Sequence, residues 1–105
     1  MSLTFVETTV FTKRIKELMS DDSYRRLQVA LVNNPEFGDI IKGSGGLRKI
    51  RWGSEQKGKR GGVRVIYYLK LASGKIYMLY VYAKTEQEDL TKEQLRILAG
   101  LRGAK

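Results

Sequence analysis

Histidine and cysteine are both absent from this chain of 105 residues, and proline occurs only once. Without cysteine the chain can form no disulfide and offers no thiolate nucleophile. With neither residue type, a zinc or iron site is not expected, so we predict no metal and no cofactor. Any acid–base chemistry must therefore use lysine, arginine, tyrosine, aspartate or glutamate.

Long apolar runs are missing as well. No run approaches the ~18 residues that indicate a membrane-spanning helix, and the N-terminus lacks the charged and apolar segments of a signal peptide. We therefore expect a cytoplasmic protein without a membrane partner. The length fits a single domain over residues 1–105, and a hydrophobic content of 42% is enough for one core.

Acidic residues are scarce in the middle of the chain. Residues 42–84 contain eleven basic side chains and one acid, Glu55, a net charge of +10, whereas residues 1–41 sum to −1 and residues 85–105 to zero. Charge segregated in this way is self-repulsive, and its usual use is to attract a polyanion, most often nucleic acid. The composition also leaves two other partners open: a membrane surface and an acidic protein.

Aromatic residues are interleaved with these basic residues, among them Trp52, Tyr68, Tyr80 and Tyr82. Cations neutralise phosphates and aromatic rings stack on bases, so this mixture suits a single-stranded or unpaired RNA segment. The structural alternative is a solvated basic face with the aromatic rings in the core.

The spacing of apolar residues predicts an α+β domain. The expected order is β-α-α-β-β-β-α, which indicates an antiparallel sheet with an N-terminal helical hairpin on one face and a C-terminal helix. Residues 53–62 contain no apolar side chain and are expected to form a flexible basic loop. The predicted elements are a strand at 3–6, helices that begin near Thr8 or Thr9 and near Ser20 and end before Pro35, strands at 47–52, 63–71 and 76–83, and a helix with a capping box at Thr91 and Gln94.

Cleavage of RNA needs a group that helps to remove the 2′-OH proton, a group that stabilises charge on the phosphate, and a group that protonates the leaving 5′-oxygen. Arginine suits bidentate contact with phosphate. A lysine among like charges has a lowered pKa, and a tyrosine near cations has its phenolate favoured. The composition therefore permits catalysis but does not demonstrate it.

The register between the last two strands decides whether these groups meet. If the hairpin connection between the two strands has an even number of residues, Arg64 lies beside Ala83, and both Tyr82 and Lys84 point to the other face. If that connection has an odd number of residues, or if one strand contains a bulge, Arg64 lies on the same face as Tyr82 or Lys84. A composite catalytic site requires the second arrangement, or a chain that leaves the sheet before Lys84.

Three segments resemble the HigB branch of the RelE-type toxins of bacterial toxin–antitoxin pairs: GLRKIRW at 46–52, GKRGGVRVIYY at 58–68 and YVYAKTEQEDLTKEQ at 80–94. The resemblance implies a RelE-like domain and a ribosome-dependent endoribonuclease, an mRNA interferase. Such toxins enter the decoding site of the small ribosomal subunit, against its rRNA, and cut the mRNA without a metal. The products are a 2′,3′-cyclic phosphate and a 5′-hydroxyl, and translation is inhibited. A cognate antitoxin neutralises the toxin, and we expect the free toxin to be a monomer.

The resemblance also implies roles for particular residues. Arg64 matches the arginine that holds the scissile phosphate, and Lys84 matches a basic residue at the end of the last strand. Lys49 and Arg51 match a basic pair, one member of which transfers a proton or stabilises charge. Tyr82 is expected to replace a tyrosine that RelE proper carries later in its chain. The expected RNA- and ribosome-binding residues are Arg48, Lys57, Lys59, Arg60 and Trp52.

The chain also departs from the family pattern. RelE proper has a second arginine where this chain has Thr85 and a tyrosine near the position of Thr91, and some HigB toxins use histidines at the site. The identity of the acid and the base therefore stays open. A basic RNA- or ribosome-binding module without catalysis is the second hypothesis. A DNA-binding repressor is the third, but the helical hairpin lies in residues 1–41, which carry no positive surplus.

Overall fold

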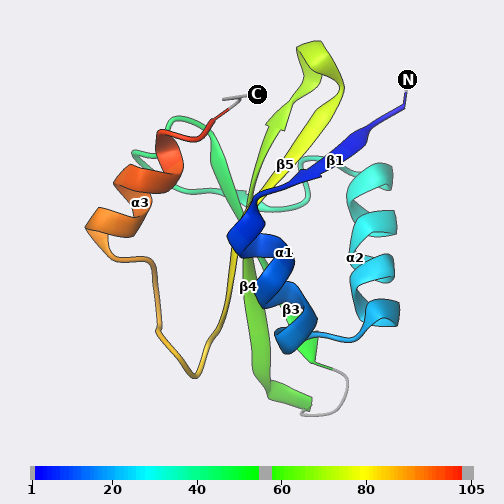
Figure 1. Ribbon diagram of the computed structural model, residues 1–105, viewed down its shortest axis with the longest axis vertical. Helices are drawn as coiled ribbons and strands as arrows, with labels where there is room; N and C mark the ends of the chain where they lie inside the picture. Colours follow the sequence, from blue (N-terminus) through cyan, green and yellow to red (C-terminus); the bar gives the residue numbers. More distant parts are fainter. Residues whose placement is uncertain (1, 55–57, 103–105) are drawn as a thin grey trace.

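The computed structural model describes residues 2–54 and 58–102 (Figure 1). Its elements combine three helices, one short 3-10 helix and five strands, which confirms the predicted α+β class. Within these residues no helix has the length and apolar character to cross a membrane. The elements are β1 (Thr4–Glu7), α1 (Thr9–Leu18), α2 (Asp21–Asn33), β2 (Asp39–Ile40), β3 (Leu47–Ser54), β4 (Gly58–Lys70), the 3-10 helix η1 (Leu71–Ser73), β5 (Lys75–Ala83) and α3 (Lys92–Ala99).

The five strands form one sheet in the order β1-β5-β4-β3-β2. Strands β3, β4 and β5 pair antiparallel, as predicted, and β2 pairs antiparallel with β3, but β1 pairs parallel with β5, so the sheet is mixed. The two-residue strand β2 was not predicted, because two residues show no alternation. The long strands β4 and β5 lie inside the sheet, and they are apolar on both faces because each face carries a hydrophobic core.

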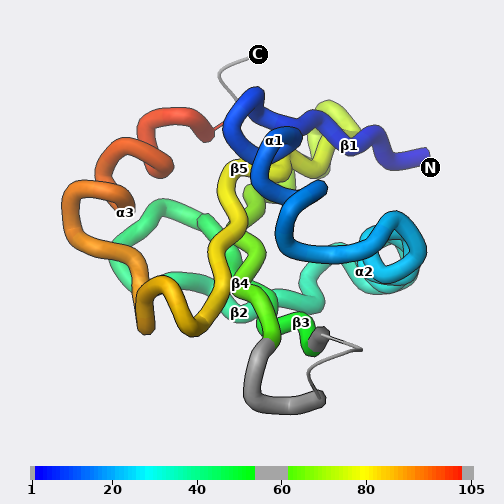
Figure 2. Tube along the Cα trace, turned by 60° about the horizontal axis from the view of Figure 1, so that its bottom comes forward, coloured from blue at the N-terminus to red at the C-terminus, as the bar shows by residue number. Residues whose placement is uncertain are grey.

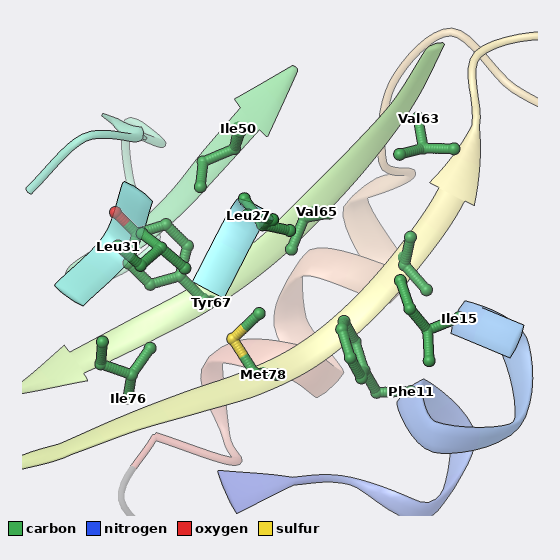
Figure 3. Close-up of a cluster of buried hydrophobic side chains, with 11 residues drawn as sticks. Phe11, Ile15, Leu27, Leu31, Ile50, Val63, Val65, Tyr67, Ile76 and Met78 are labelled. Carbon is green, nitrogen blue, oxygen red and sulfur yellow. The ribbon is translucent and has the colours of Figure 1, made fainter. Parts of the chain in front are cut away.

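Helices cover both faces of the sheet. Helices α1 and α2 pack on one face and α3 packs on the other (Figures 1 and 2). The larger core lies under α1 and α2, where Phe11 and Leu27 are fully buried against the sheet residues Val65 and Met78 (Figure 3). The smaller core lies under α3 and includes Leu98.

The helix boundaries follow from local side-chain chemistry. The Thr8 hydroxyl accepts a hydrogen bond from the backbone N–H of Phe11, and the Ser20 hydroxyl accepts one from Ser23, both at 3.0 Å. These are the N-caps of α1 and α2. The predicted capping box of Thr91 and Gln94 is present at the start of α3.

The predicted flexible loop at 53–62 is wrong for most of its length. Strand β3 continues to Ser54 and β4 begins at Gly58, so the two strands lengthen into the polar segment. Strand pairing uses backbone groups, and the lack of apolar side chains did not prevent it. Lys57 lies outside the described residues, and the side chains of Lys59 and Arg60 also lie outside the described part of the chain.

Tyr67 anchors the segment between α2 and β2 to the core. Its hydroxyl donates to the Pro35 carbonyl oxygen at 2.7 Å and accepts from the Gly38 N–H at 2.9 Å, and the residue is fully buried. The replacement Tyr67→Phe leaves both backbone groups without this partner. We expect the free energy of unfolding to fall by about 1–3 kcal/mol, measured by urea denaturation. An unchanged value would show that water replaces the hydroxyl.

Candidate active site

A bulge in β5 sets the register on which the candidate site depends. Tyr67 pairs with Met78 but Ile66 pairs with Tyr80, so Leu79 is an extra residue on β5. Beyond this bulge Arg64 pairs with Tyr82. The structure therefore has the second of the two predicted arrangements, in which Arg64 shares a face with Tyr82.

Three of the predicted site residues form one row across three strands, which we call the Arg–Arg–Tyr row: Arg51 on β3, Arg64 on β4 and Tyr82 on β5. Arg51 pairs with Arg64, and Arg64 pairs with Tyr82, so all three side chains lie on the face that carries α3. Tyr82 is fully buried, Arg64 is half-buried and Arg51 is exposed. The row thus runs from the small core beneath α3 to the surface.

The two arginines of the row stand directly opposite each other in an antiparallel pair. Like charges in this position destabilise a sheet. Among the side chains that the structure describes, neither Arg51 nor Arg64 has an acidic partner within ion-pair distance. An anion bound between the two guanidinium groups would remove this repulsion, and a phosphate matches their geometry.

Tyr82 places an unpaired hydroxyl beside the two arginines. Its oxygen is buried and has no hydrogen-bond partner among the residues that the structure describes, an unusual condition for a buried polar atom. Burial raises the pKa of Tyr82, as does the charge of Asp89, whereas the charges of Arg64 and Arg51 lower it. The expectation that nearby cations favour the phenolate is therefore wrong here, because burial outweighs them. Tyr82 stays protonated at neutral pH and can donate a hydrogen bond or a proton.

Lys49 lies on β3 two residues before Arg51, on the same face of the sheet as the row. It pairs with Ile66, which in turn pairs with Tyr80. The Lys49 ammonium contacts the Asp89 carboxylate at 2.9 Å. The predicted crowding of lysines by like charges is thus not the environment of Lys49, since its contact is an acid. The pKa of Asp89 lies below its ordinary value, first because of the hydrogen bond from Lys49.

Lys84 follows the last residue of β5. Its backbone N–H donates to the Gly62 carbonyl oxygen at 3.3 Å, which continues the register by one step before the chain leaves the sheet. Lys84 is exposed, and no described side chain pairs with it. The chain then returns on the side of the sheet that carries α3 (Figure 1).

Two further residues, Arg14 and Glu86, support the site and were not found by sequence reasoning. Beyond β1 the outer edge of β5 has no neighbouring strand in the described part of the chain, and the Arg14 Nε donates to the Val81 carbonyl oxygen there at 2.7 Å. Glu86 forms an ion pair with Arg14 and accepts the Ala83 N–H. The Arg14 guanidinium lies 5.5 Å from the centre of the Tyr80 ring. These contacts hold the part of β5 that carries Tyr82.

Two residues predicted to bind RNA lie away from the row. Trp52 belongs to the opposite face, where its indole N–H donates to the Ser23 hydroxyl at 3.0 Å and its ring packs against the larger core. The Arg48 guanidinium donates to the backbone carbonyl oxygens of Glu36 and Gly38. Both side chains have structural contacts that account for them without RNA. The described residues contain no cluster of three or more potential metal ligands.

No family model matches the sequence. Among solved structures, the chain is similar to the Escherichia coli toxin RelE, in a mutant with two arginines replaced by alanine, in the free state. The TM-score is 0.64 at 14% sequence identity, over 95% of this chain and 96% of the RelE chain. The protein therefore has the fold of the RelE toxin over nearly its whole length.

Proposed function

We propose that this protein is a toxin of the HigB branch that cleaves mRNA on the ribosome. The observation that carries the proposal is the Arg–Arg–Tyr row: two facing arginines and a buried, unpaired phenol on a RelE-like fold. Neither feature stabilises the folded protein, since facing like charges and an unpaired buried hydroxyl both oppose folding. Residues that oppose folding are typical of functional sites.

In the proposed reaction the 2′-hydroxyl of the RNA gives its proton to water and its oxygen attacks the adjacent phosphorus. The bond between phosphorus and the 5′-oxygen breaks, and the 5′-oxygen takes up a proton. Arg64 and Arg51 contact the non-bridging oxygens and stabilise the charge that grows on them in the transition state. Tyr82, which is protonated, donates toward the same phosphate or its leaving oxygen. Lys49 and Lys84 add ammonium groups on either side of the row. The cyclic phosphate retains the bond to the 2′-oxygen, and the released strand begins with a hydroxyl.

The net charge of residues 42–84 supports ribosomal RNA and mRNA as partners, and a cognate antitoxin completes the proposed system. An endonuclease of this kind needs no cofactor and no metal of its own. The free protein is proposed to be a cytoplasmic monomer, because the positive surface of one copy repels another.

The test uses the purified protein with ribosomes that carry a defined mRNA. We expect new 5′ ends inside the translated frame, with 5′-hydroxyl and 2′,3′-cyclic phosphate termini, and no such ends on the mRNA alone. A kinase that labels only 5′-hydroxyls identifies the termini directly. Saturation of ribosomes by the protein without any new ends would contradict the proposal and favour the non-catalytic binding module.

A further inference from the structure

Asp89 is an acidic residue within a site that is otherwise basic. It lies on the segment between β5 and α3, and its carboxylate contacts the Lys49 ammonium at 2.9 Å across 40 positions of sequence. The charge of Asp89 also acts on Tyr82, and that of Arg51 acts on Asp89. The carboxylate therefore lies beside both the Arg–Arg–Tyr row and Lys49.

Hydrogen bonds that begin at α3 hold the backbone at Asp89 in place. The Gln87 side-chain amide donates to the Asp89 carbonyl oxygen at 2.7 Å and to the Gln94 side-chain oxygen at 2.9 Å. Gln94 is also the partner of Thr91 in the capping box, since its side-chain oxygen accepts the Thr91 N–H. A chain of hydrogen bonds thus runs from the first turn of α3 to Asp89. Support of this kind is what a precisely placed functional group requires.

Stability does not account for the contact between Asp89 and Lys49. The Asp89 side chain is 72% exposed and the Lys49 side chain 22% exposed. Exposed ion pairs contribute about 0–1 kcal/mol to folding at most. A carboxylate also weakens the attraction of a basic site for phosphate, so its presence there needs another reason.

We propose that Asp89 is a positioning residue, which holds the Lys49 ammonium in the orientation that the cleavage reaction needs. This inference rests on the proposed function. A lysine side chain has several rotatable bonds, and an ammonium without a fixed partner samples many positions. Asp89 holds the Lys49 ammonium beside the row, where the Asp89 charge also acts on Tyr82. When RNA binds, Lys49 then meets the phosphate from a fixed direction.

The experiment compares Asp89→Asn with the matched variant Glu88→Gln, which removes the same charge one residue earlier. Glu88 is exposed, and no described side chain is its partner. Single-turnover cleavage on programmed ribosomes is measured separately from ribosome affinity. We expect Asp89→Asn to lower the cleavage rate by about tenfold to a hundredfold, with affinity unchanged or tighter. Glu88→Gln is expected to cleave at the wild-type rate.

The same substitution of Asp89, made in a protein that already carries Lys49→Ala, isolates the role of Lys49. In Lys49→Ala, the added Asp89→Asn change is expected to have no further effect on the rate, because the group that it positions is already absent. Asp89→Glu, which keeps a carboxylate, is expected to restore part of the rate. A full, additional loss in the Lys49→Ala background, or no loss in the single variant, would overturn the inference while the wild type still cleaves. An inactive wild type would instead overturn the proposed function, and the inference with it.

Discussion

Replacing Arg64 with alanine lowers ribosome-dependent cleavage by about 10²–10³-fold, if the guanidinium stabilises the transition state as proposed. Arg64 occupies the middle of the Arg–Arg–Tyr row, so it is the group that faces both Arg51 and Tyr82. Loss of a donor aimed at developing charge affects the chemical step more than substrate binding. The expected result is a large fall in the single-turnover rate with a small change in ribosome affinity.

The fold is expected to tolerate the Arg64→Ala change. Arg64 is half-buried and forms no ion pair with the described side chains, and its removal relieves the repulsion by Arg51. The thermal midpoint should therefore stay within a few degrees of the wild type, as measured by circular dichroism.

Two control variants separate chemistry from charge. Arg25→Ala removes the same charge from an exposed position on α2 and should leave cleavage unchanged. Arg64→Lys keeps the charge but loses the planar fork and should give an intermediate rate. Equal rates for Arg64→Ala and Arg25→Ala would contradict the assigned role of Arg64.

The sequence predicted the local features of the fold well and the long-range ones less well. Caps at Thr8, Ser20 and Thr91 depend on residues three positions apart, so the pattern is visible in the chain itself. The parallel pairing of β1 with β5 joins segments about 70 residues apart, and nothing in either segment indicates it. The position of the bulge at Leu79 is equally hard to predict, because the residues before and after Leu79 in the sequence are both apolar.

In the candidate site, too, local features were predicted and long-range contacts were not. Arg51, Arg64 and Tyr82 were predicted from residue type and resemblance, and alternation on each strand determined which of them could share a face. Asp89 and Arg14 were missed, because loop and helix segments bring them to the site from distant positions. The place of Trp52 among basic residues suggested base stacking; strand alternation turns its side chain toward Ser23, and its contact with RNA stays a prediction.

The variant Tyr82→Phe is expected to lose activity without losing stability. The phenol oxygen is buried and unpaired, so its removal breaks no hydrogen bond within the described structure. Removing an unsatisfied buried polar group leaves the free energy of unfolding unchanged or raises it by about 1 kcal/mol. Tyr67→Phe is the matched comparison, since Tyr67 is also fully buried but its hydroxyl has two partners. Urea denaturation should therefore find Tyr67→Phe less stable than the wild type and Tyr82→Phe at least as stable.

Cleavage by Tyr82→Phe should fall by about a hundredfold, the scale of a lost proton donor. Because burial raises the pKa of Tyr82, its phenol remains protonated throughout the neutral range, and the wild-type rate should not rise through a tyrosine titration between about pH 7 and 9. A rate that rises with pH in the wild type but not in Tyr82→Phe would identify the phenolate as a base and contradict the donor role. Wild-type cleavage by Tyr82→Phe would remove Tyr82 from the reaction. Loss of cleavage in a protein that is at least as stable as the wild type would show that the unpaired phenol is retained for chemistry, since packing does not require it.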